Sequence, residues 1–145
     1  MADIRVYRAG PADLAAILPL VREFCAADGH EYDEPRVSRA LGPLLDGDAH
    51  GQVWLVGAAA GYAVVTWGWS LESGGREALL DEIYVRERGH GAGAALLERV
   101  LAAAAQAGAA VMFLETEAHN DRVRGFYARH GFTADDSVWM SRALD

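Results

Sequence analysis

Cysteine and long apolar runs are scarce or absent in this sequence, and each absence excludes a class of protein. The only cysteine, Cys25, has no partner for an internal disulfide, which excludes a disulfide-stabilised scaffold. No stretch reaches the roughly 18 uninterrupted apolar residues of a membrane span. The most apolar region, 92–114, is interrupted by Glu98, Arg99 and Gln106. The N-terminus lacks the basic-then-apolar pattern of a secretion signal. We therefore expect a cytoplasmic protein with no membrane partner.

Basic residues are outnumbered by acidic ones, with 13 Lys and Arg against 21 Asp and Glu and a net charge of −8. A nucleic-acid-binding surface needs a basic footprint, so general nucleic-acid binding is excluded. The acidic balance suits a cationic substrate, and equally suits a surface that serves only solubility. We predict no metal site, because His90, His119 and His130 are scattered and have no cysteine partners.

Hydrophobic periodicity predicts an α/β fold, and 145 residues fit one domain, 1–145. We expect strands over 4–8, 52–58, 62–70, 77–85, 110–115, 132–133 and 138–142, and helices after Asp13, over 37–45, over 91–107 and from Asn120 or Asp121 to His130. Pro19 should kink or shorten the first helix. The strands between 52 and 85 follow one another without helices, which favours an antiparallel meander. The predicted architecture is a mixed, largely antiparallel sheet with helices on both faces.

The glycine-rich stretch Arg88-Gly89-His90-Gly91-Ala92-Gly93 lies between an apolar run, 79–85, and a segment rich in alanine and leucine. Glycines let the backbone approach a ligand closely, and the first N–H groups of a helix have no internal partner. Such a turn binds a phosphate through backbone donors and the helix dipole, with Arg88 adding positive charge. The sequence therefore predicts a site for a phosphorylated cofactor.

Two cofactors are compatible with this turn. Gly89, Gly91 and Ala94 match the dinucleotide fingerprint, but that fingerprint normally belongs to the first of several strand-helix units. Here the turn lies past the middle, after a meander, and only about 50 residues follow it. Arg88, Gly91 and Gly93 also satisfy the pattern R-x-x-G-x-G. That pattern resembles the pyrophosphate loop of the GCN5-related N-acetyltransferases, the GNAT family.

The resemblance to the GNAT family extends over nearly the whole chain. Residues 80–85 resemble its fourth strand, and 114–115 followed by Asn120 resemble its fifth strand and the next turn. Residues 125–132 resemble its last helix, in which a tyrosine, here Tyr127, precedes Gly-Phe by four residues. Four motifs occur in the family's order and at compatible spacings. Membership of the family therefore explains the sequence better than a glycine turn that matches by chance.

The resemblance implies acetyl-CoA as the cosubstrate. The backbone of Ile83, Tyr84 and Val85 would meet the pantetheine arm and the thioester, and the loop would hold the pyrophosphate. His90 adds a donor or is simply an exposed loop histidine, and Asn120 bonds the arm or is an ordinary helix cap. The implied cofactor-binding residues are Ile83, Tyr84, Val85, Arg88, Gly89, His90, Gly91, Ala92, Gly93, Asn120 and Tyr127.

The implied chemistry is attack of an amine on a thioester. Tyr127 stands at the family's position for the general acid, because a phenol keeps its proton at neutral pH; its alternative role is packing on the helix face. A backbone N–H near Val85 would stabilise the oxyanion. Two carboxylates, Glu115 and Glu82, remain near-equal candidates for the base, and each would otherwise serve in a structural ion pair.

The acceptor site is expected in the first helix pair and the meander. Glu31 and Tyr32 lie in an acidic, aromatic loop, and the alternation of Trp67 and Trp69 places both indoles on one face. Acid and aromatic groups suit a cationic amine, whereas core, dimer-interface or solvated roles are the alternatives. We expect a single-domain acetyltransferase for a small, cationic primary amine. The alternatives are acetylation of a protein N-terminus or lysine, and an acyl-CoA-binding sensor; the apolar segment 138–140 suggests a homodimer.

Overall fold

The computed structural model describes residues 4–145 and divides into two compact units, Met1–Leu114 and Glu115–Asp145. The first unit contains the sheet and three helices, and the second contains one helix and an extended C-terminal segment. That residues 1–145 form a single domain stays a prediction. No helix within residues 4–145 combines the length and the apolar character that crossing a membrane requires.

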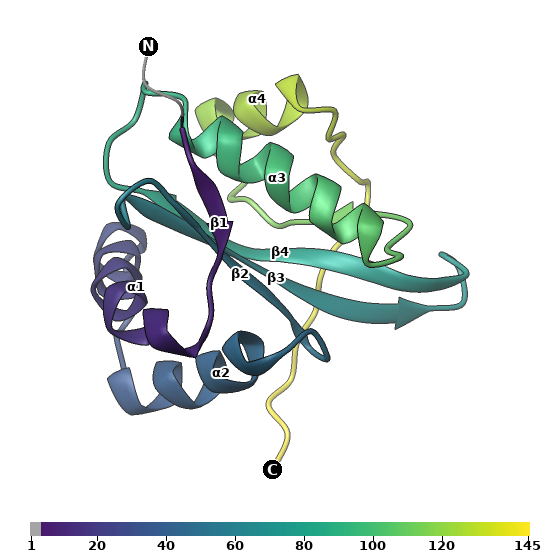
Figure 1. The fold of residues 1–145 in the computed structure, drawn as a ribbon. Coiled ribbons are helices and arrows are strands. Elements are labelled where there is room, and N and C mark those ends of the chain that lie inside the picture. The colour runs from purple at the N-terminus through teal and green to yellow at the C-terminus, as the bar shows by residue number, and fades with distance from the viewer. Residues whose placement is uncertain (1–3) are drawn as a thin grey trace. The chain divides into compact units, whose positions relative to one another are not determined.

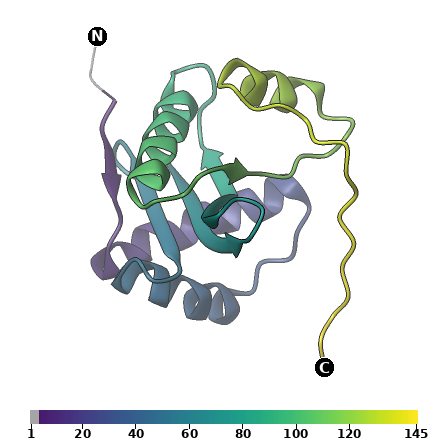
Figure 2. The ribbon, with the colours of Figure 1, turned by 90° about the vertical axis from the view of Figure 1, so that its right-hand side faces the viewer.

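The first unit is a five-stranded sheet with helices on both faces, as Figures 1 and 2 show. Its elements are β1 (Val6–Arg8), a short 3-10 turn (Pro11–Asp13), α1 (Leu14–Asp28), α2 (Glu34–Asp46), β2 (Gly51–Val56), β3 (Gly61–Ser70), β4 (Gly75–Val85), α3 (Ala92–Gln106) and β5 (Met112–Phe113). The strands lie in chain order, antiparallel from β1 to β4, and β5 pairs in parallel with β4. The predicted meander and mixed sheet are confirmed.

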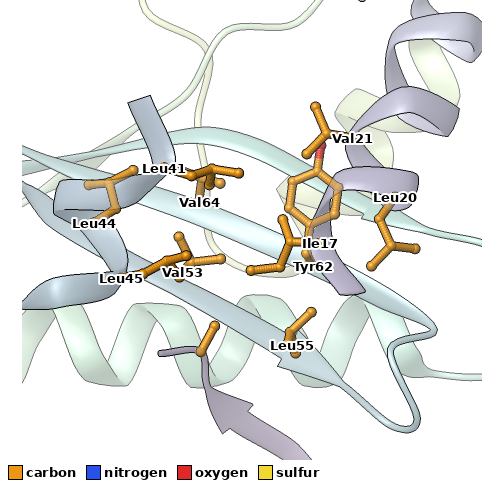
Figure 3. Close-up of a cluster of buried hydrophobic side chains, with 11 residues drawn as sticks. Ile17, Leu20, Val21, Leu41, Leu44, Leu45, Val53, Leu55, Tyr62 and Val64 are labelled. Atoms are coloured by element: carbon orange, nitrogen blue, oxygen red, sulfur yellow. The ribbon is translucent and has the colours of Figure 1, made fainter. Parts of the chain in front are cut away.

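The core of the first unit has one layer on each side of the sheet. On one face, alternate residues of β2 and β3 pack against α1 and α2 (Figure 3); the labelled members are Ile17, Leu20, Val21, Leu41, Leu44, Leu45, Val53, Leu55, Tyr62 and Val64. On the other face, α3 contacts β2, β3 and β4, and its Leu96, Leu97 and Val100 are fully buried. Period-two alternation in the strands is what lets one sheet supply both layers.

The first helix is longer than the sequence predicts, because Pro19 neither ends it nor shortens it. α1 continues nine residues beyond this proline to Asp28 and ends at Gly29, which has a left-handed backbone. The buried neighbours Ile17, Leu20 and Val21 pack the middle of α1 on the sheet. This packing offsets the hydrogen bond that a proline removes from a helix interior.

The second unit contains α4 (Asp121–Arg129), for which Asn120 is the cap: its side-chain oxygen accepts a hydrogen bond from the backbone N–H of Val123 at 3.2 Å. The final strands predicted over 132–133 and 138–142 are wrong, because residues 130–145 form neither helix nor strand. Within this unit α4 offers no strand edge to pair with, and extended backbone becomes a strand only beside another strand. The strand predicted over 110–115 is likewise reduced to the two residues of β5.

Candidate active site

The predicted glycine loop follows β4 directly and leads into α3. Gly89 and Gly91 have φ values of +83° and +81°, in the left-handed region where a side chain is strained. Gly91 is the N-cap of α3, and no side chain caps that helix. The N–H groups of the first turn, beginning at Ala92, therefore keep their capacity to bind an anion. The loop has the backbone geometry that phosphate binding requires.

Arg86, at the start of this loop, forms an ion pair within the protein. Its guanidinium donates to both carboxylate oxygens of Glu23 in α1, at 2.7 to 3.1 Å, and the hydroxyl of Tyr84 donates to the same carboxylate at 3.1 Å. Arg86 holds the pKa of Glu23 below its usual range through these hydrogen bonds. The loop also borders a surface hollow of about 290 Å³, lined by Ala58, Ala60, Arg86, Glu87, His90 and Ala92. Arg88 and His90 are exposed.

The edge of β4 that faces away from β3 is open along most of the predicted cofactor strand. β5 pairs with β4 only at Ala78 and Leu79. Within the described part of the first unit, residues 4–114, no strand pairs with that edge from Leu80 to Val85. The open edge contains Ile83, Tyr84 and Val85, and it leads straight to the loop. An extended ligand can pair with such an edge as an added strand does.

A β-bulge in β4 determines where Glu82 points. Val64 is opposite Glu82 and Val65 is opposite Leu80, so Asp81 is the extra residue on β4. A regular strand would place Leu80 and Glu82 on the same face; the bulge sends them to opposite faces. Glu82 therefore shares the face of Val64, toward α1 and α2. The strand is therefore irregular at Asp81, and simple alternation does not give the faces of its neighbours.

Glu82 is half-buried and hydrogen-bonded. The hydroxyl of Tyr62, a fully buried residue of β3, donates to Glu82 Oε1 at 2.6 Å. Burial raises the pKa of Glu82, and the nearby charge of Asp81 raises it further, while the Tyr62 hydrogen bond acts in the opposite direction. Burial also raises the pKa of Tyr62, so the phenol remains a donor whenever the carboxylate is ionised. A carboxylate of raised pKa suits a general base at neutral pH.

The remaining predicted catalytic residues belong to the second unit. Glu115 is exposed and lies outside any strand. Tyr127 is buried in α4, in edge contact with the rings of Phe126 and Phe132, at centroid distances of 5.3 and 5.6 Å. Burial raises the pKa of Tyr127, which keeps its hydroxyl protonated at neutral pH. Asn120 has the capping role described above.

The four residues predicted to bind the acceptor fall into two separate groups within the first unit. Trp67 and Trp69 share a face as predicted, but it is the face opposite Glu82, since Trp67 pairs with Ala78 beyond the bulge. The ring of Trp67 lies under Arg76, and Trp69 is 76% exposed. Glu31 and Tyr32 precede α2, and Tyr32 borders a second hollow of about 390 Å³ together with Arg22 and Glu34.

Sequence reasoning missed two partners, Tyr62 and Glu23. Tyr62 bonds Glu82, about 20 positions away in the chain, and Glu23 bonds Tyr84, about 60 positions away. Alternation along β3 alone places Tyr62 on the same face as Val64. Glu82 lies on that face only because of the bulge at Asp81, and the residue types at 80–82 do not predict a bulge.

Comparisons with known proteins identify the fold and the family of this chain. An integron cassette protein from the mobile metagenome of Cole Harbour Salt Marsh is 30% identical, with a TM-score of 0.86 over 97% of this chain and 90% of that one. Two more distant structures share the fold. One is a ribosomal-protein-alanine N-acetyltransferase from Brucella melitensis biovar Abortus 2308, with 20% identity and a TM-score of 0.76 over 98% of this chain and all of that one.

The other is an aminoglycoside acetyltransferase from an uncultured soil metagenomic sample, in complex with sisomicin, with 17% identity and a TM-score of 0.78 over 97% of this chain and 95% of that one. Among curated proteins, none matches this chain. The model of the acetyltransferase (GNAT) family matches residues 17–132, which include most of α1, strands β2 to β4, the glycine loop and α4. The chain therefore belongs to the acetyltransferase (GNAT) family.

Proposed function

We propose that this chain is an acetyl-CoA-dependent N-acetyltransferase, which moves an acetyl group directly to the primary amine of a small, cationic acceptor. The observation that carries the proposal is the continuity of three features in the first unit. The open edge of β4 from Leu80 to Val85 leads into the glycine loop and then into a helix with no side-chain cap. Glu82, a carboxylate of raised pKa, belongs to the same stretch of strand.

The residues present fit acetyl-CoA. A pantetheine arm carries amide groups that can pair with the open edge of β4, and a pyrophosphate matches the donors at the start of α3. Because Arg86 is bonded to Glu23, backbone donors rather than this guanidinium would hold the phosphates. Arg88, which is exposed beside them, would add charge. When bound, acetyl-CoA supplies an activated thioester.

The residues of the chain would then act as the general base and the general acid. Glu82 takes one proton from the acceptor ammonium, which frees the nitrogen lone pair for attack on the carbonyl carbon. The carbon–sulfur bond breaks as the amide forms, and the nitrogen loses a second proton. Tyr127 is proposed to protonate the departing sulfur and to recover its own proton from the nitrogen through water. One proton is released to solvent for each acetyl group moved.

Burial favours Glu82 over Glu115 as the base. A half-buried carboxylate of raised pKa can accept a proton near neutral pH, whereas Glu115 is exposed. Asp81 and Asp28 add negative charge that acts on Glu82. A cationic amine is the acceptor that such a group of carboxylates attracts.

The test is thiol release from acetyl-CoA in the presence of polyamines, aminoglycosides, amino acids and short alanine- or lysine-containing peptides. Wild type is compared with Glu82→Gln, Glu115→Gln and Tyr127→Phe, and with Glu72→Gln as an exposed-glutamate control in the β3–β4 turn. Loss of a base or acid should reduce kcat/KM by about 10²–10⁴-fold in the Glu82 and Tyr127 variants. The Glu115 and Glu72 variants should keep wild-type rates.

Each alternative has its own signature in the same experiment. Turnover with peptides alone would assign a protein N-terminus or lysine as the acceptor. Binding of acetyl-CoA by calorimetry without turnover of any amine would replace the enzyme with a sensor. Absence of acetyl-CoA binding would refute the assignment of the glycine loop.

A further inference from the structure

We propose that Tyr62 is a positioning residue for the reaction: its hydroxyl holds one oxygen of Glu82 and leaves the other to accept the acceptor's proton. This inference rests on the proposed function, because it concerns the base of that reaction. Tyr62 itself touches neither the acceptor nor the thioester in this proposal. It acts only through the carboxylate.

The hydrogen bond has the geometry of a strong, fixed contact. The Tyr62 hydroxyl lies 2.6 Å from Glu82 Oε1, a distance typical of an O–H donor bonded to a charged carboxylate. Among residues 4–145, Tyr62 is the only side chain that donates to Glu82. One carboxylate oxygen is therefore occupied by the protein, and Oε2 has no side-chain donor from the described residues.

The ring of Tyr62 cannot turn its hydroxyl away. The residue is fully buried, and Figure 3 shows it in the core layer with Ile17 and Val21 of α1. The rings of Phe24 and Tyr84 contact it at centroid distances of 6.4 Å each. A donor fixed by packing on both sides imposes one rotamer on the more exposed carboxylate, which is how a supporting residue orients a reactive group.

The electrostatics of this cluster give the proposal a measurable consequence. Glu82 interacts electrostatically with Asp81 on its own strand, with Cys25 and Asp28 of α1, and with His30 just after that helix. His30 and Asp28 form an ion pair at 2.7 Å. Burial and the negative neighbours raise the pKa of Glu82, whereas the hydrogen bond from Tyr62 and the charge of His30 lower it. Removing the Tyr62 hydroxyl should therefore make the carboxylate hold its proton to a higher pH.

A core tyrosine with no role in the reaction predicts a different result. A purely structural hydrogen bond to Glu82 would also raise the midpoint of this carboxyl group when it is lost, but the acidic limb of kcat/KM against pH would not follow that midpoint. Tyr7 provides the matched control, because its half-buried ring packs against the same core layer from β1. Tyr7→Phe removes a phenol from that layer but leaves the bond to Glu82 intact.

The experiment is a ¹³C NMR titration of protein labelled at the glutamate side-chain carboxyl carbon, with the Glu82 signal identified by its absence in Glu82→Gln. In Tyr62→Phe the midpoint for Glu82 should move upward by about one to two pH units, the size expected for losing one hydrogen bond to a charged group. Tyr7→Phe should leave the midpoint unchanged. The acidic limb of kcat/KM against pH should move with the NMR midpoint, while the KM for acetyl-CoA stays the same.

The outcomes separate this inference from the proposed function. An active Tyr62→Phe enzyme with unchanged Glu82 titration, or with a shifted titration but an unmoved acidic limb, overturns the role of Tyr62 alone. A wild-type protein that acetylates no amine overturns the proposed function and this role with it. If Tyr62→Phe does not fold, the wild type decides: the Tyr62 hydroxyl proton should be protected from exchange and change its chemical shift as Glu82 titrates. A shift that ignores that titration refutes the hydrogen bond's role.

Discussion

Gly61 makes a close backbone approach in the candidate site, and replacing it with alanine tests whether β4 must be held at its observed distance from β3. A Cβ atom at position 61 would lie 2.5 Å from the carbonyl oxygen of Tyr84, 2.8 Å from Val85 Cγ1 and 3.0 Å from Val85 Cα. Ordinary contact begins at 3.4 Å, so the shortest of these distances is too small by about 0.9 Å. Two of the three atoms are backbone and cannot move by rotating a side chain.

The strands must therefore separate at Tyr84 and Val85, where the cofactor strand is proposed to bind the thioester arm. Overpacking of this kind costs about 1–3 kcal/mol. For a chain near this size, about 2–4 °C of Tm is lost per kcal/mol, so Gly61→Ala should melt about 2–12 °C lower than wild type by differential scanning calorimetry. Because the displaced backbone is the proposed ligand contact, acetyl-CoA affinity measured by titration calorimetry should fall by about tenfold or more.

Gly42→Ala is the matched control with the opposite sign. Gly42 lies inside α2, and an added Cβ would meet nothing within 4 Å. Alanine is favoured over glycine in a helix by about 1 kcal/mol, so this variant should melt higher and bind acetyl-CoA as wild type does. A Gly61→Ala protein that keeps both the wild-type Tm and the wild-type affinity would refute the reasoning about this contact.

Three further predictions test separate features. Gly91 has a φ of +81°, and an added Cβ atom would lie 3.2 Å from Ile4 Cδ1, so Gly91→Ala should lower the free energy of unfolding by about 1–2 kcal/mol and weaken acetyl-CoA binding. Gly10→Ala is the control, because an added Cβ atom there meets open space, and it should change neither the melting curve nor the binding titration. Glu23→Gln should lower the Tm at pH 7 but not at about pH 2, because Arg86 holds the pKa of Glu23 below its usual range and the stabilisation is lost as pH falls through that lowered pKa. Equal Tm differences at both pH values would contradict this. Trp139 is 74% exposed, so Trp139→Ser should leave the Tm of a dilute sample unchanged. If residues 138–140 join two copies of the chain, the same variant should sediment as a monomer where the wild type sediments as a dimer. A dimer that persists in the variant would exclude this segment as the interface.

Local chemistry was readable from the sequence, and long-range register was not. The strand, glycine loop and α3 form one continuous stretch, and helix starts and glycine turns depend on neighbours a few residues away. The bulge at Asp81 depends on how β3 and β4 pair, so the face occupied by Glu82 could not be read from alternation. The apolar residues 138–140 have the composition of a strand, yet strand propensity is realised only where a partner edge exists. Trp67 and Trp69 share a face of β3 as predicted, and the bulge places Glu82 on the opposite face.

The contacts of Glu23 explain how an acceptor pocket can vary while the chemistry stays in place. Arg86 and Tyr84 both bond this α1 carboxylate, so the helix beside the proposed acceptor site is attached to the end of β4 where the cofactor is proposed to lie. Tyr62, held between Phe24 of α1 and Tyr84 of β4, extends the same attachment to Glu82. Residues on the outer side of α1 and before α2, such as Tyr32, take no part in it. We expect substitutions there to change which amine the proposed acceptor site recognises without moving the proposed base, as is expected where one fold serves many acceptors.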